Sequence, residues 1–267
     1  MHALNRWIPL TIVMLLTGTA AAHLSPHDQD AAARLVQAYP TVLERVDGSV
    51  LVWKDATRMP LTHSGARTYS ARLDHPGLLD QLKIQYPACA PLGAAALNTD
   101  PGRVRYEPLF LKMYGASAAE VHKKLETVKW FGQRVSVTSV NGAAASLRQV
   151  AQEISSHPEL LRYAQPSAGA FLWRKVASTA RQSLHSFGAA IDVNTSLSDY
   201  WQWRGFKEGQ PGISYRNRMP LGLVKIFERH GWIWGGRWYH YDTMHFEYRP
   251  ELTGKTACGR EATAEKK

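Results

Sequence analysis

The sequence has only two cysteines, Cys89 and Cys258, among 267 residues. Neither lies in a closely spaced cysteine pair, so the chain lacks the motif by which zinc fingers and ribbons hold their metal. Two cysteines in an exported protein predict a disulfide between them. In the chain-entropy model, a bridge that closes so long a loop contributes ~4–5 kcal/mol to stability.

Long hydrophobic runs are also scarce. The one strongly apolar stretch is Trp7–Leu16, which follows Arg6 and precedes the small residues Ala20–Ala22. This pattern is typical of a secretory signal peptide over residues 1–22, and the apolar run is too short for an ordinary membrane span. An uncleaved N-terminal anchor is the alternative. We therefore expect a periplasmic or secreted protein that begins near His23 and has no stable membrane span after cleavage.

Acidic residues are few relative to basic ones, 22 against 32, which gives a net charge of +10. Such an excess favours anionic partners, which include cell-wall polymer, lipid head groups and nucleic acid. The basic residues are scattered, and no nucleic-acid-binding motif is present. We therefore expect no nucleic-acid partner, and we interpret the charge as attraction to an anionic wall or membrane surface. A nucleic-acid binder would instead show a steep dependence of binding on salt.

The chain also lacks internal repeats and a long linker, while its hydrophobic content of 45% is enough for a real core. Turn residues and hydrophobic spacing predict a mixture of helices and short strands. The expected strands are 134–140, 171–176, 188–193, 232–238, 243–248 and a hairpin over 42–53, and the expected helices are 28–39, 117–128, 143–155 and 220–230. Several strands close together near the C-terminus favour an α+β fold with a small antiparallel sheet. Residues 23–150 form an N-terminal extension or lobe whose role the sequence does not define.

Two short stretches carry the candidate chemistry. SLHSFGAAID contains His185 and Asp192, and YHYDTMHFEY contains His245 in an apolar, strand-like run. Two histidines and one aspartate, without an evident fourth protein ligand, match a catalytic zinc site with an open position for water. Zinc in such a site lowers the pKa of water toward ~7.

A hydrolytic site of this kind also needs a general base. Asp242 precedes His245 by three residues and lies on the expected turn into the strand. Glu247 competes for this role, because a spacing of two places it on the same strand face as His245. Glu247 could instead orient a ligand histidine through a hydrogen bond.

The combined motif resembles that of the zinc D-alanyl-D-alanine carboxypeptidases of the VanY and VanX type, which share an architecture with lysostaphin-like peptidases and the hedgehog signalling domain. The resemblance rests on Ser183-x-His185-x-x-Gly188-x-Ala190-x-Asp192 and on Asp242-x-x-His245. It covers about residues 168–252, and it assigns residues 151–267 to a zinc peptidase domain.

The resemblance implies a role for each of these residues. His185, Asp192 and His245 correspond to the zinc ligands, and Asp242 corresponds to the catalytic acid/base. Arg174 corresponds to the arginine that stabilises the oxyanion of the tetrahedral intermediate, a role for which a fixed guanidinium is well suited. His240 corresponds to an auxiliary histidine, and Ser183 corresponds to a serine that supports the site through a hydrogen bond.

The implied function is zinc-dependent hydrolysis of the peptide stem of peptidoglycan. The family includes carboxypeptidases that remove terminal D-Ala and endopeptidases that cut within the stem or cross-link. A carboxypeptidase needs a cation for the terminal carboxylate of its substrate, and the sequence leaves Arg181, Arg204 and Arg237 open. The alternatives are a non-catalytic zinc-containing wall-binding domain and a zinc amidase at the glycan–peptide junction. The sequence does not define the oligomeric state.

Overall fold

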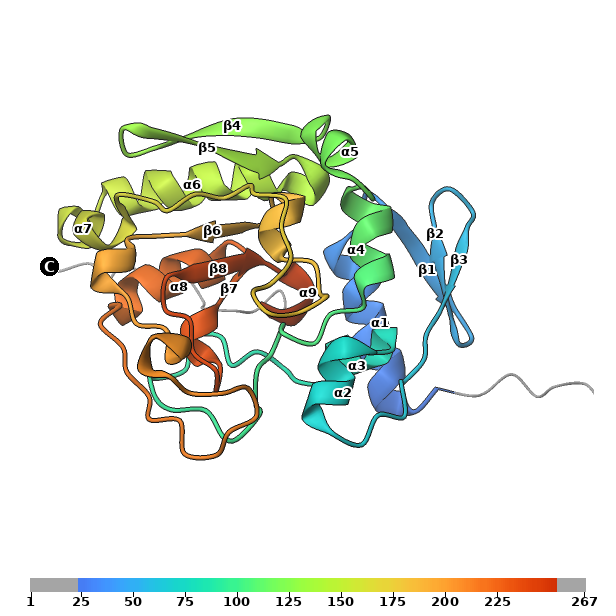
Figure 1. Ribbon diagram of the computed structural model, residues 1–267. Helices are drawn as coiled ribbons and strands as arrows, with labels where there is room; N and C mark the ends of the chain where they lie inside the picture. The colour runs from blue at the N-terminus through green and yellow to red at the C-terminus, as the bar shows by residue number, and fades with distance from the viewer. Residues whose placement is uncertain (1–23, 254–267) are drawn as a thin grey trace, which may run out of the picture.

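The computed structural model describes residues 24–253 (Figure 1). Over this range the fold is α+β with small antiparallel sheets, as the sequence predicted. The predicted signal peptide, and Cys258 of the predicted disulfide, lie outside the described residues. The helices and strands are α1 Pro26–Ala38, β1 Leu43–Asp47, β2 Val50–Trp53, β3 Arg58–Pro60, α2 Tyr69–Asp74, α3 Leu78–Leu82, α4 Glu107–Tyr114, α5 Ala118–His122, β4 Leu125–Trp130, β5 Gln133–Thr138, α6 Ala143–Ser155, α7 Leu161–Ala164, β6 Ala190–Asp192, α8 Leu221–Arg229, β7 Trp232–Trp234, β8 His245–Tyr248 and α9 Pro250–Thr253.

The sheet near the C-terminus has the strand order β6-β8-β7 and is antiparallel throughout. Side chains of β8 alternate between its two faces, so Phe246 points into the core while His245 and Glu247 share the opposite face. Phe246 stacks on Phe227 of α8 with ring centroids 3.8 Å apart. Helix α6 packs against α8 and against the hairpin β4–β5 (Figure 1). One face of the sheet is thus buried, which leaves the other free for the polar residues.

The predicted helix over residues 117–128 is wrong beyond its first turn. Ser117 caps a short α5 as expected, since its hydroxyl accepts a hydrogen bond from the backbone N–H of Glu120 at 3.3 Å. The chain then becomes β4, which pairs with β5 in register from Leu125 opposite Thr138 onward. Val128 and Trp130 are both fully buried at a spacing of two. This spacing of two is typical of a strand. Pairing with β5, a tertiary contact, therefore decides that the segment is a strand and not a helix.

The predicted strand over residues 171–176 is also wrong. This segment forms only an isolated bridge between Lys175 and Gln182. Two further backbone hydrogen bonds hold it beside the site, from Leu172 N to His185 O at 3.1 Å and from Ser183 N to Arg174 O at 3.1 Å. The segment therefore follows the loop that carries Ser183 and His185 without joining a sheet.

The N-terminal region packs closely against the rest of the chain. Helix α1 contacts both α3 and α9, and the hydroxyl of Tyr39 donates a hydrogen bond to Glu251 at 2.7 Å. One buried cluster joins Leu35 and Phe110 to Leu184 and Phe187, so it includes residues on both sides of position 150. The domain boundary at residue 150 stays a prediction. Among residues 24–253, no helix is long and apolar enough to cross a membrane.

Gly188, in the turn after His185, has a φ of +63° and lies against the β4–β5 hairpin. A Cβ atom here would lie 2.6 Å from Leu125 Cδ2 and 3.0 Å from the backbone N of Thr138. Gly48 has a similar φ of +58° but open space around it. We expect Gly48→Ala to lower the free energy of unfolding by ~1 kcal/mol through backbone strain alone. Gly188→Ala should lower it by ~2–4 kcal/mol because the steric clash adds to that strain.

Urea denaturation followed by circular dichroism measures both changes. Equal destabilisation of the two variants would contradict the close packing of Gly188 against the hairpin.

Candidate metal centre

His185 lies in a short 3₁₀ helix, Leu184–Phe187, directly before Gly188. The hydroxyl of Ser183 accepts a hydrogen bond from the backbone N–H of His185 at 3.3 Å, which caps this helix. The ring Nδ1 lies 2.6 Å from the carbonyl oxygen of Ala170 and can only donate to it. His185 therefore presents Nε2 as a ligand atom toward the cavity.

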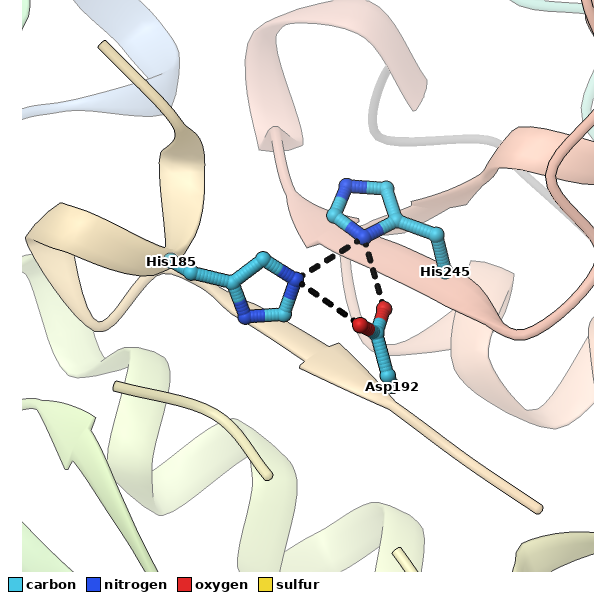
Figure 2. Close-up of side chains that lie close together, drawn as sticks. All are labelled: His185, Asp192 and His245. Carbon is cyan, nitrogen blue, oxygen red and sulfur yellow. Dashed lines mark hydrogen bonds and ion pairs between the residues drawn. The ribbon is translucent and has the colours of Figure 1, made fainter. Parts of the chain in front are cut away.

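Asp192 ends β6 and His245 begins β8, and the two residues are directly opposite each other in the antiparallel pairing. Directly opposed side chains share one face of a sheet, so both point toward His185 (Figure 2). The Nδ1 atom of His245 lies 2.9 Å from Asp192 Oδ1 and 3.1 Å from Nε2 of His185. Nε2 of His185 lies 3.2 Å from Asp192 Oδ2.

These distances fit a zinc ion. A tetrahedral zinc with ligands at 2.0–2.1 Å places its ligand atoms ~3.3 Å apart. The three observed separations are close to that value, and one ligand atom from each residue lies within 4.8 Å of the others. Burial would raise the pKa of Asp192, but the charges and hydrogen bonds of His185 and His245 hold it far below its usual range. The carboxylate of Asp192 is thus anionic at neutral pH, as a metal ligand would have to be.

Glu247 orients the second histidine. Its Oε1 lies 3.0 Å from Nε2 of His245, which directs the other ring nitrogen toward the metal position. Arg105 and Arg249 each donate to this buried carboxylate at 3.3 Å. Burial disfavours its charge, but Arg105, His245 and Arg249 outweigh this effect and lower the pKa of Glu247 to about 2. A carboxylate with so low a pKa and so many partners is a poor general base.

Asp242 differs from Glu247 in its hydrogen bonding and in the direction of its pKa shift. Its backbone N–H donates to the carbonyl of Gly235 at 3.0 Å, which fixes the turn before β8. Its Oδ1 is buried without a hydrogen-bond partner among residues 24–253. Burial raises the pKa of Asp242 to about 7. The charges of His245 and His185 oppose this increase, while the negative charge of Asp192 adds to it. Of the two candidate bases, Asp242 is the one suited to exchange protons near neutral pH.

Arg174 lines the same cavity as the metal ligands, which has a volume of about 320 Å³. Its backbone N–H donates to the hydroxyl of Ser186 at 2.8 Å, so the main chain is fixed. Its exposed guanidinium donates at 3.4 Å to the carbonyl of Lys175 and has no carboxylate partner among the described residues. The side chain is therefore available to an anion in the cavity.

His240 borders this cavity but is fully buried and already has partners for both ring nitrogens. Its Nδ1 lies 2.6 Å from Asp100, and its Nε2 accepts the backbone N–H of Gly209 at 2.9 Å. The ring also stacks on Tyr69, with centroids 5.5 Å apart. The auxiliary catalytic role stays a prediction, and in this structure His240 ties residue 100 and the loop at Gly209 to the site.

The structure also brings in residues that the sequence analysis missed. Arg103 and Arg105 line the cavity, although they lie about eighty residues before His185. No local motif marks them, because only the folded chain brings them near the metal ligands. The three arginines that the sequence left open for a substrate carboxylate, Arg181, Arg204 and Arg237, do not line this cavity.

The hydrogen bond of Glu247 to His245 can be tested through metal affinity. Glu247→Gln keeps the shape of the side chain but removes the charge that fixes the imidazole orientation. We expect zinc affinity to fall ~10- to 100-fold, as measured by competition with a chromogenic chelator. Glu159→Gln, at an exposed position, is the matched control and should leave the affinity unchanged. An unchanged affinity in Glu247→Gln would show that His245 does not depend on this contact.

Comparisons with known proteins agree with this site. Residues 177–248 match the family model described as D-alanyl-D-alanine carboxypeptidase. This range contains His185, Asp192, Asp242 and His245, and it begins three residues after Arg174. Searches of curated proteins and of solved structures gave no match. The chain thus carries at residues 177–248 a domain of the D-alanyl-D-alanine carboxypeptidase family, a family of metallopeptidases, with a His-Asp-His group that can bind a metal ion.

Proposed function

We propose that this protein is an exported zinc metallopeptidase that hydrolyses the peptide stem of peptidoglycan. The observation that carries the proposal is the convergence of His185, Asp192 and His245 at zinc-ligand spacing in a cavity that also contains Asp242 and Arg174. The family of the domain at residues 177–248 supports a peptide substrate. The net charge of +10 and the expected signal peptide support a location at an anionic wall, either periplasmic or extracellular.

Different side chains of the cavity have different roles in the proposed peptide hydrolysis. When bound, zinc supplies a Lewis acid that lowers the pKa of water and polarises a carbonyl. Asp242, whose pKa is about 7, takes a proton from the attacking water and delivers it to the leaving amine. Arg174 lines the same cavity, and its positive charge would stabilise the developing oxyanion of the tetrahedral intermediate.

Mass spectrometry of purified muropeptides tests this proposal. The mature protein should shorten or open the stem peptide, and a chelator should abolish the reaction until zinc is restored. Release of the whole stem from muramic acid would instead identify an amidase. The absence of any zinc-dependent product would favour the non-catalytic wall-binding alternative.

The role of Asp242 has a direct test. Asp242→Asn keeps the size of the side chain but cannot accept a proton, so kcat should fall ~10²- to 10⁴-fold while one zinc ion stays bound. Asp30→Asn, on the exposed side of α1, is the control and should keep full activity. If Asp242→Asn retained most of its activity, Glu247 would have to be considered the base despite its low pKa.

Arg174 should act mainly on the transition state. Arg174→Gln removes the charge that faces the oxyanion, so we expect kcat to fall ~10²- to 10³-fold with KM nearly unchanged. Steady-state kinetics on a stem peptide separate the two constants. A rise in KM at unchanged kcat would assign Arg174 to substrate binding and not to oxyanion stabilisation.

A further inference from the structure

The segment Asp100–Arg105 lies along the metal cavity, although it precedes the family match by more than seventy residues. Several bonds to the C-terminal part of the chain hold this segment in place. The carbonyl of Pro101 accepts the indole N–H of Trp238 at 2.6 Å, and the carbonyl of Gly102 accepts a hydrogen bond from Arg249 at 3.1 Å. The segment is therefore a fixed wall of the cavity.

The two arginines of this wall differ in their partners. Arg103 donates to Tyr69 at 3.0 Å, to Asp100 at 3.4 Å and to Glu208 at 2.7 Å. Two of these partners are carboxylates, so the charge of Arg103 is neutralised within the protein. Arg103 thus has little capacity left for a substrate anion.

Arg105 has N–H donors that its partners within the protein do not use. A guanidinium has five N–H donors. Arg105 donates to Glu247 at 3.3 Å and to the carbonyl of Gln182 at 3.5 Å, and both of these contacts are long. Its Nε has no hydrogen-bond partner among residues 24–253, and this nitrogen is not fully buried. Because Arg105 lines the metal cavity, its side chain is open to a ligand there.

The electrostatic surroundings of Arg105 favour an anion. Burial lowers the pKa of Arg105 to about 10; Glu247 opposes this shift, while the charges of Arg249, Arg103 and Arg181 add to it. Its one carboxylate partner among residues 24–253, Glu247, is shared with Arg249 and His245. A second carboxylate beside Arg105 would relieve the repulsion between these cations.

Arg105 also lines the cavity that contains His185, Asp192 and His245. Its Nη1 and the Nε2 of His245 contact the same oxygen of Glu247. In a peptide that ends one residue beyond the scissile bond, the terminal carboxylate follows the scissile carbonyl by a single residue, or ~3.8 Å between α-carbons. A cation that recognises this carboxylate must therefore line the same cavity as the candidate metal ligands, as Arg105 does.

We propose that Arg105 binds the terminal α-carboxylate of the peptide substrate, so that the enzyme is a carboxypeptidase and not an endopeptidase. This proposal rests on the proposed function, because it names the end of the substrate that the same cavity holds. A guanidinium forms paired hydrogen bonds with a carboxylate, and an uncharged terminal amide would lose both the charge and one acceptor. The selectivity for a free C-terminus would thus come from a residue outside the family match.

The wild-type protein gives the first test, without any substitution. Diacetyl-L-Lys-D-Ala-D-Ala and its C-terminal amide differ only in the group that Arg105 would bind. We expect kcat/KM for the free acid to exceed that for the amide by ~10- to 100-fold, the range for a hydrogen bond to a charged group. Equal cleavage of the two peptides would overturn the carboxylate site and leave the peptidase function intact.

Variants then assign the preference to this side chain. Arg105→Gln should abolish the preference for the acid, and Arg105→Lys should retain part of it because the charge stays while the planar fork is lost. Arg204→Gln is the matched control, since Arg204 is exposed, contacts Ser214 and does not line the cavity. Zinc content and circular dichroism confirm that each variant is folded and loaded. A full preference in a folded Arg105→Gln protein would overturn the proposal.

Binding distinguishes a failure of this proposal from a failure of the proposed function. Calorimetry with the Asp242→Asn protein compares the acid and the amide when no turnover occurs. Tighter binding of the acid that Arg105→Gln removes would support the carboxylate site even if the wild-type protein cleaved neither peptide. Equal binding of the two peptides would overturn the site whatever the activity.

Discussion

The antiparallel pairing of β6 with β8 is the constraint on which the rest of the site depends. It places Asp192 directly opposite His245, so two of the three candidate metal ligands are a cross-strand pair. The third, His185, reaches them because the turn at Gly188 folds the chain tightly before β6 begins. A shift of the register by one residue would move His245 and Glu247 to the core face and Phe246 to the site. The packing of Phe246 against Phe227 therefore also fixes the metal position.

The ligands are in turn oriented by residues from distant parts of the chain. Glu247 fixes His245, and Arg105 stabilises the charge of Glu247. Asp100 holds His240 on the border of the cavity. The N-terminal region thus supplies contacts that the domain at residues 177–248 does not contain within itself. Arg103 and Arg105 of this region line the cavity of the candidate metal ligands, wherever the domain boundary lies.

Much of the site could be predicted from the sequence because its residues are close together along the chain. The spacing from His185 to Asp192, and from Asp242 to His245, reflects a turn followed by a strand, which local patterns can indicate. The same patterns predicted the helix at 143–155 and the hairpin at 42–53, which the structure confirms. They failed at Leu125–Trp130, where only the partner strand β5 decides between helix and strand. They also could not identify Arg105, because its place beside Glu247 depends on contacts over 142 residues of sequence.

In the proposed metal centre, one zinc ion is held by Nε2 of His185, Nδ1 of His245 and a carboxylate oxygen of Asp192. A crystal structure of the zinc-loaded protein, with anomalous data collected at the zinc edge, tests it most directly. We predict a single anomalous peak at ~2.0–2.2 Å from these three atoms, with Glu247 hydrogen-bonded to His245 and not bound to the metal. A peak elsewhere, or a metal that Glu247 binds directly, would contradict this assignment of the ligands.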